Sequence, residues 1–277
     1  MSEGKWTSDE LFTRLLNNKS QEAYWDDVSE LRKRPNNDVF TKSFELAKSN
    51  DDLQKIIGLD ILQQLGFEPR FNKKETLDLH FELLEVAQSN RVLVSIFHGI
   101  GHNNDELEDW QISKLVEFKN QTNTEVKHAL ISALSGIENL QAISALIEFT
   151  KQKEPSIRNW ATFGIGTQID TDNAEIRNAL WNLVGDSDYD TKSEAIVGLA
   201  KRNDEKIKKV ILAELQSDSF GTLLFDAILA LGDDDYLPIL NDKLQQVKNE
   251  DNEINRGWIP ALEGTIEELE KRTHNSA

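Results

Sequence analysis

The sequence has no cysteine among its 277 residues. This absence excludes a disulfide framework, a cysteine-ligated zinc or iron–sulfur site, and a thiol nucleophile. Long apolar runs are also missing, because no stretch approaches the roughly 20 residues that a membrane-spanning helix needs. The first residues, Met1 to Trp6, lack the basic and then apolar pattern of a secretion signal. We therefore expect a chain that is cytoplasmic and carries no disulfide.

Positive charge is scarce, since 31 Lys and Arg stand against 49 Asp and Glu and the formal net charge is −18. Nucleic-acid phosphates and anionic membrane surfaces would repel such a chain. We therefore predict no nucleic acid and no membrane as a partner. The same charge would attract a basic protein.

Strand patterns and nucleotide-binding motifs are absent as well. Apolar residues recur three and four positions apart, and only five prolines interrupt them, which indicates an all-α protein. GxxxxGK[ST], GxSxG, HExxH and GxGxxG do not occur, and two GxG triplets, at 99–101 and 164–166, lack the third glycine. Nothing here predicts a phosphate loop or a hydrolase nucleophile.

One ten-residue phrase recurs along the chain, with apolar residues at its first, fifth, sixth and ninth places and small ones at its eighth and tenth. Copies 31 to 35 residues apart begin at Ile57, Val92, Val126, Ile157, Thr191 and Leu223. A worn seventh copy starts near Asn255. One phrase per step at this period is typical of a helical solenoid.

A second amphipathic helix is predicted between consecutive phrases, so that each repeat consists of two antiparallel helices joined by short polar turns. The predicted helices span Lys73 to Ala87, Glu106 to Phe118, Leu140 to Thr150, Ala174 to Leu183, Glu205 to Leu215 and Leu237 to Val247. Residues 1–37 are predicted to form an N-terminal helical cap with helices over 8–16 and 21–34. Residues 38–277 would form the repeat solenoid, continuous with the cap as one domain.

Three segments carry a family resemblance: EPSIRNWATFGIG, NTEVKHALISALS and DYDTKSEAIVGLA. A turn acid or amide is followed by an apolar–basic pair and a helix of small residues. These segments resemble the HEAT-like repeats of the bacterial type named after phycobilisome lyases, over about Val39 to Ala261. The resemblance implies a right-handed α-solenoid of about seven helix pairs, with the phrase helices on its concave face. It also implies bonds between repeats from Lys127, Arg158 and Lys192.

The same family supports protein–protein scaffolding in most members and chromophore lyase activity in a few. The related di-iron hydroxylases carry His-Glu pairs at the third and fourth places of the phrase, and no copy here has that pair. The resemblance therefore predicts the fold more sharply than the function.

The register of the phrase also predicts a surface. With the first residue numbered zero, positions 4, 5 and 8 form an apolar core stripe, and positions 3, 6 or 7, and 10 lie opposite. Position 3 is short or acidic except at Trp160, and an exposed Trp among polar groups is a typical binding anchor. We predict a partner-binding surface formed by Trp160, Thr162, Thr167, Asp170, Asp172, Glu194, Lys201, Arg202, Asp204, Asp226 and Asp60.

Three alternatives remain open at this point. Trp160 would instead fold onto Phe163 as half-buried core, and Asp170 and Asp172 would be only loop and cap residues. The small residues at position 7, such as Gly198, would either let neighbouring helices approach closely or leave room for a partner.

Metal and cofactor chemistry has little support. His98 and His102 stand four apart on one helical face, but no third ligand is fixed by the sequence, so they are weak metal candidates. We predict no catalytic residue and no cofactor. The expected function is a non-enzymatic scaffold or adaptor that binds a basic protein on an acidic concave face. The alternatives are a lyase or binding protein for a tetrapyrrole or aromatic ligand, and an acidic inhibitor of a basic toxin.

Overall fold

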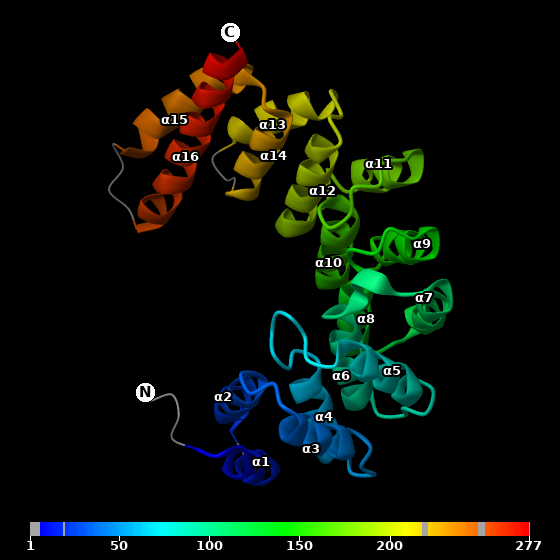
Figure 1. Ribbon diagram of the computed structural model, residues 1–277. Coiled ribbons are helices and arrows are strands. Elements are labelled where there is room, and N and C mark those ends of the chain that lie inside the picture. The colour runs from blue at the N-terminus through cyan, green and yellow to red at the C-terminus, as the bar shows by residue number, and fades with distance from the viewer. Residues whose placement is uncertain (1–5, 19, 218–220, 249–252, 277) are drawn as a thin grey trace. The chain divides into compact units, whose positions relative to one another are not determined.

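The computed structural model is built of helices (Figure 1) and describes residues 6–18, 20–217, 221–248 and 253–276. No strand occurs within these ranges, which confirms the all-α prediction. Contacts divide the chain into two compact units, Met1–Ala145 and Leu146–Ala277.

The first unit begins with the two cap helices and continues with three helix pairs. Its helices are α1 (Ser8–Asn17), α2 (Gln21–Arg32), α3 (Asn37–Ala47), α4 (Asp52–Leu62), α5 (Lys73–Leu84), α6 (Asn90–Gly101), α7 (Asp109–Val116) and α8 (Thr124–Leu134). Short 3-10 turns at Asn104–Glu106 and Glu117–Asn120 flank α7. α4 packs on α6 and α6 on α8, while α5 packs on α6 and α7 on α8. The phrase helices therefore form one row and the alternate helices a second.

The second unit repeats this arrangement. Helix α9 (Leu140–Phe149) crosses the boundary between the units, and the later helices are α10 (Pro155–Gly166), α11 (Ala174–Trp181), α12 (Tyr189–Lys201), α13 (Ile207–Leu215), α14 (Leu223–Leu231), α15 (Leu237–Lys248) and α16 (Glu253–Ser276). α10 packs on α12, α12 on α14 and α14 on α16. Counted from α3 to α16, the described helices make the predicted seven pairs, and the chain is an all-α helical-repeat protein.

Two local signals fix where the helices begin. In the turns before α8 and α12, the side chains of Asn123 and Asp188 accept hydrogen bonds from the backbone N–H groups of Val126 and Thr191, at 3.0 and 2.9 Å. Such caps satisfy donors that have no partner within the helix. Pro155 occupies the first turn of α10, where its fixed φ suits a helix start.

The cap and the first helix pair share a core. Leu11, Phe12 and Leu15 of α1 cluster with residues of α2, α3 and α4. The helix Asn37–Ala47 was missing from the predicted list, because its segment precedes the first copy of the phrase.

A glycine at position 7 allows two phrase helices to approach closely. A Cβ atom added to Gly198 would lie 2.7 Å from Cα of Gly166, so α10 and α12 touch backbone to backbone. Close packing is therefore the role of this small residue. Across the described ranges, no helix combines the length and the apolar character needed to cross a bilayer.

Candidate functional site

Helices α10, α12 and α14 frame a groove of about 500 Å³ in the second unit. Its lining residues come from the stripe at positions 3, 6, 7 and 10 of the phrase, together with the residues that flank it. They are Phe163, Thr167, Gln168, Glu194, Val197, Lys201, Leu223, Asp226, Leu229 and Ala230. Four residues of the predicted surface, Thr167, Glu194, Lys201 and Asp226, therefore meet in one place, which we call the α10–α12–α14 groove.

Trp160 lies beside this groove. Its side chain is 52% exposed, and its ring packs edge-to-face on Phe163 with the ring centroids 5.8 Å apart. Because Phe163 lines the groove, the indole stands at its border, with about half of its side chain exposed to solvent. The alternative for Trp160, a half-buried core position on Phe163, explains the contact between the two rings. It does not explain why the side chain is 52% exposed.

Glu194 is the electrostatic centre of the groove. Burial of the side chain raises its pKa to about 7; Lys201 opposes that shift, while Asp226 and Asp190 add to it. Its Oε2 atom is buried and accepts no hydrogen bond from any group in the described part of the chain. Lys201 instead donates to the backbone oxygen of Thr167 at 3.3 Å. Glu194 thus lines the groove with a carboxylate whose Oε2 atom is shielded from solvent and has no hydrogen-bond donor.

Two predicted surface residues of this unit are buried, and for them the prediction is wrong. The side chain of Thr162 is fully buried and donates to the backbone oxygen of Arg158 at 2.6 Å. The side chain of Arg202 is only 7% exposed. Its guanidinium donates to the backbone oxygens of Ile165, Gly166, Ile169, Thr171 and Gly198. Both side chains hold backbone together rather than face a partner.

Asp60 is a third correction. It lies in the first unit and is 5% exposed, because α2 covers it and Tyr24 donates its hydroxyl to the carboxylate at 2.7 Å. Ser95 and Ala129, at the same phrase position, are buried too. Position 3 is therefore exposed at Trp160 and Asp226 and half-buried at Glu194 in the second unit, and its side chains are buried in the first.

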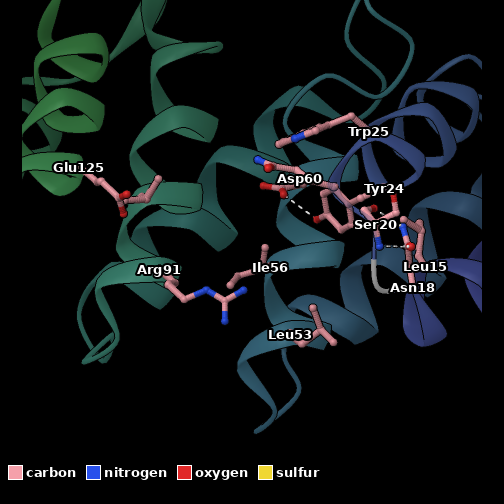
Figure 2. Close-up of a pocket in the computed structure, with 12 residues that line it drawn as sticks. Leu15, Asn18, Ser20, Tyr24, Trp25, Leu53, Ile56, Asp60, Arg91 and Glu125 are labelled. Carbon is pink, nitrogen blue, oxygen red and sulfur yellow. Dashed lines mark hydrogen bonds between the residues drawn. The ribbon is translucent and has the colours of Figure 1, made fainter.

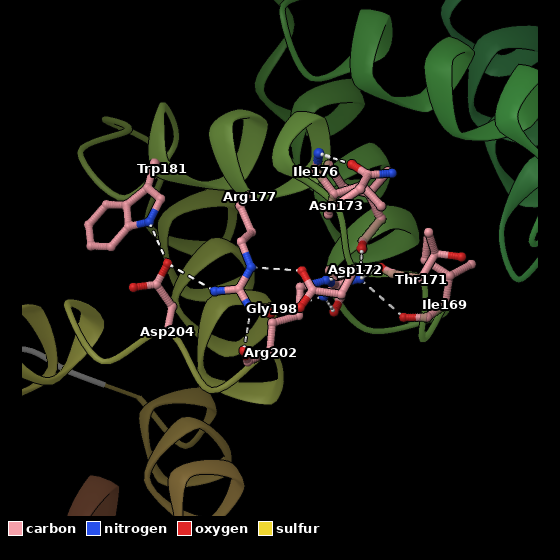
Figure 3. A network of polar contacts seen from close by, with 12 residues as sticks. Ile169, Thr171, Asp172, Asn173, Ile176, Arg177, Trp181, Gly198, Arg202 and Asp204 are labelled. Atoms are coloured by element: carbon pink, nitrogen blue, oxygen red, sulfur yellow. Dashed lines mark hydrogen bonds and ion pairs between the residues drawn. The ribbon is translucent and has the colours of Figure 1, made fainter.

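Asp172 and Asp204 belong to a separate polar network away from the groove (Figure 3). Arg177 donates to both carboxylate oxygens of Asp172, at 2.7 and 2.6 Å, and to Asp204 at 3.2 Å. The indole N–H of Trp181 also donates to Asp204, at 2.9 Å. The hydrogen bonds from Arg177 lower the pKa of Asp172. Both acids are therefore engaged in contacts within the protein. Asp170 is exposed in the turn that precedes α11.

Two of the three residues expected to bond between repeats, Arg158 and Lys192, form ion pairs with the following repeat. Arg158 donates through two nitrogens to the carboxylate of Asp186, at 2.8 and 2.7 Å, and so ties α10 to the turn before α12. Lys192 of α12 pairs with Glu214 of α13 at 2.7 Å. Lys127 is half-buried in α8.

The two histidine candidates show no metal geometry. His102 lies 3.2 Å from the side chain of Gln64, and partial burial with Arg32 and Arg70 nearby lowers its pKa to about 4. Burial and His128 lower the pKa of His98. The one group of three potential metal ligands within the described ranges is Asp233, Asp234 and Asp235, which is remote in sequence from both histidines.

Sequence reasoning missed some groups of this region. Phe163 is at position 6 of its phrase, on the predicted open stripe, and its size was the available signal. Leu223 begins its phrase and stands outside the predicted open stripe, yet it lines the groove. Arg177 is on an alternate helix, outside the register of the phrase, so no signal pointed to its network.

Comparisons with known proteins find relatives of similar sequence and a solved structure of similar fold. No protein-family model matches the chain. Protein YibA of Escherichia coli K12 is 33% identical over 150 residues, which cover 54% of this chain and 52% of YibA. YibA of E. coli O157:H7 matches to the same extent. The chain thus spans about half the length of the curated relatives it matches.

Structural comparison extends further along the chain. The X-ray structure of E. coli YibA superimposes with a TM-score of 0.68 at 24% identity, covering 96% of this chain and 93% of that one. This likeness shows the fold. Human deoxyhypusine hydroxylase matches with a TM-score of only 0.35 at 13% identity, too weak to carry an argument. The likeness to phycobilisome-lyase-type HEAT repeats stays a prediction.

Proposed function

We propose that the chain is a protein-binding module without enzymatic activity, which holds a basic protein in the α10–α12–α14 groove and does so in the cytoplasm. One observation carries the proposal: Oε2 of Glu194 is buried in the groove without a hydrogen-bond donor, next to the exposed Trp160. A Lys or Arg side chain of a partner that enters the groove would pair with this carboxylate through a charge-assisted hydrogen bond.

The surroundings of Glu194 favour the same class of partner. Asp226 of α14 is exposed and also lines the groove, and the net charge of −18 attracts cations from a distance. Trp160 supplies apolar area beside this charge, and buried Trp side chains are among the strongest anchors in protein interfaces. Charge would steer the partner and the indole would retain it.

A ligand-binding lyase is the alternative class, and an inhibitor of a basic toxin is a special case of the proposed function. For the lyase we would expect an enclosed hollow lined by Trp and His, and no His lines the α10–α12–α14 groove. The inhibitor rests on charge alone.

The test is quantitative capture of basic proteins from the native host by the immobilised full chain. Trp160→Ala and Glu194→Lys should each reduce recovery of the true partner at least tenfold. Two matched controls should retain it: Trp110→Ala, which removes an exposed Trp from α7, and Glu175→Lys, which reverses an exposed acid on α11. If both groove variants keep every partner that the wild type binds, the groove is not the binding site.

The pH dependence of the captured complex gives an independent readout of Glu194. Its pKa of about 7 means that the carboxylate is ionised above pH 7 and protonated below it. Affinity for a cationic partner should therefore fall as the pH is lowered from 8 to 6. Glu194→Gln should bind more weakly at pH 8 and lose most of this dependence.

A further inference from the structure

A second hollow lies in the first unit, among α2, α4 and α6 (Figure 2), and shares no residue with the groove of the second unit. Its volume is about 470 Å³, within the range of ligand-binding pockets. Apolar and aromatic side chains form half of its lining: Leu15, Tyr24, Trp25, Leu53, Ile56 and Val94. We call it the Trp25 hollow.

The aromatic wall of the Trp25 hollow is fixed before any ligand arrives. The hydroxyl of Tyr24 donates to Asp60 at 2.7 Å, and the rings of Tyr24 and Trp25 pack edge-to-face with centroids 5.1 Å apart. The guanidinium of Arg32 lies 5.8 Å from the centre of the Trp25 ring and is itself hydrogen-bonded to the backbone oxygen of Asp60. Side chains held in this way lose little conformational entropy on binding.

Two large apolar side chains remain exposed at the rim. Trp25 is 44% exposed and Leu53 is 40% exposed, although both line the hollow. A small molecule inside the hollow would leave these rim surfaces in water, whereas drug-sized ligands usually bury most of their area. A polypeptide that inserts one side chain and lies across the rim would bury both, which favours a peptide as the occupant.

Arg91 gives this surface an open positive charge. Within the described part of the chain the structure gives Arg91 neither an ion pair nor a hydrogen bond, and its guanidinium extends into the space beside Ile56 (Figure 2). The carboxyl group of Asp60 is buried and already accepts the hydroxyl of Tyr24. Glu125 lines the hollow from the first turn of α8 without pairing to Arg91. A ligand carboxylate would therefore find an unpaired guanidinium next to an apolar cavity.

We propose that the Trp25 hollow binds a peptide segment in which a bulky apolar side chain stands next to a carboxylate. The apolar side chain fills the cavity against Ile56 and Val94, and the carboxylate pairs with Arg91. Trp25, Tyr24 and Arg91 belong to the three residue types that dominate energetic hot spots of interfaces. This preference is opposite in charge to that of the α10–α12–α14 groove.

The test begins with selection from a displayed library of random twelve-residue peptides against the immobilised full chain. Enriched peptides should carry Asp or Glu within two residues of Leu, Ile, Phe or Trp. Synthetic copies labelled with a fluorophore are then titrated with the full chain and followed by fluorescence anisotropy. Trp25→Ala and Arg91→Gln should each weaken binding at least tenfold, while Trp110→Ala and Lys151→Gln, the matched aromatic and cationic controls, should not.

A double-mutant cycle identifies the ion pair itself. Replacing the peptide carboxylate by its amide should weaken binding to the wild type tenfold and change binding to Arg91→Gln less than twofold. The proposal is overturned if no peptide is enriched, if the enriched peptides lack acids, or if Trp25→Ala and Arg91→Gln bind as the wild type does. Glu194→Lys should leave peptide binding unchanged, so failure here is distinct from failure of the proposed function.

Discussion

His80 is fully buried in α5, and its environment favours the neutral imidazole. Its Nδ1 atom lies 2.6 Å from the backbone oxygen of Thr76, whereas Nε2 has no hydrogen-bond partner in the described structure. Burial lowers the pKa of His80 to about 4, against about 6.5 in an unfolded chain. The unfolded state therefore binds the proton first as the pH falls, and folding stability falls with it.

The expected loss can be measured by chemical denaturation. Between pH 7 and pH 5 the protonation of this group in the unfolded chain should remove about 2 kcal/mol from the free energy of unfolding. His80→Gln should show a correspondingly smaller loss over that interval. Phe97→Leu, a core substitution without a titrating group, should lower stability at both pH values and keep the wild-type difference. An unchanged pH difference in His80→Gln would contradict this assignment.

Single residues also show where the register of the phrase is a sound guide and where it is not. Glu194, Lys201 and Asp226 line the groove because positions 3 and 10 face away from the core stripe. Thr162 is at position 5, on the core stripe. It was nevertheless predicted to be exposed, because threonine is polar and also common on protein surfaces. Asp60 shares position 3 with Glu194, but a cap helix outside the repeats covers it, which no repeat pattern could reveal.

Arg202 joins the ends of two helices. It follows α12 directly, and its guanidinium donates to the backbone oxygens of Ile165 and Gly166 at the end of α10 and of Gly198 in α12, at 2.7 to 3.0 Å. The last carbonyls of a helix have no partners within it and carry partial negative charge. One buried cation thus satisfies several acceptors at once.

Removal of this cation should be costly. Arg202→Met would keep the apolar stem and leave the buried carbonyls unpaired, so we expect the free energy of unfolding to fall by about 3 kcal/mol or more. Lys201→Met, at the exposed neighbouring position, should change it by less than about 0.5 kcal/mol. Urea denaturation of both variants provides the comparison, and equal stabilities would refute the bridging role of Arg202.

Helices were predictable from the sequence to within a few residues wherever the phrase or its alternate helix was clear, because a period of 3.6 in apolar residues specifies a buried stripe. α9 and α15 end within one residue of their predicted ends. Arg202 was misassigned although it is eleven places into its phrase, which is three residues beyond position 8 and on the same face. Arg202 was predicted to be exposed because it is charged, although its position in the phrase indicates the core face.

The molecule as a whole carries two binding candidates of opposite preference, one in each compact unit. The Trp25 hollow offers the unpaired guanidinium of Arg91, and the α10–α12–α14 groove is lined by the carboxylate of Glu194, whose Oε2 atom has no hydrogen-bond donor. Their charges were visible in the sequence, but the hollows arise from packing between helices far apart in the chain. The net charge of −18 therefore bears on the approach of a partner more than on the site where it binds.

Ionic strength separates these two contributions for a basic partner of the groove. Exposed charges act over a Debye length of about 10 Å at 0.1 M salt, so added salt should slow encounter and leave short contacts intact. Raising salt from about 0.05 M to 0.5 M should lower the association rate constant tenfold or more and change the dissociation rate constant less than threefold.

The variants should divide in the same way when the kinetics are followed by surface plasmon resonance. Glu175→Lys, outside the groove, should reduce the association rate constant modestly and leave dissociation unchanged. Trp160→Ala should accelerate dissociation at every salt concentration, because the indole acts only in contact. If salt changed mainly the dissociation rate constant, this prediction would be wrong. Acidic residues besides Asp226 and Glu194 would then have to contact the partner directly.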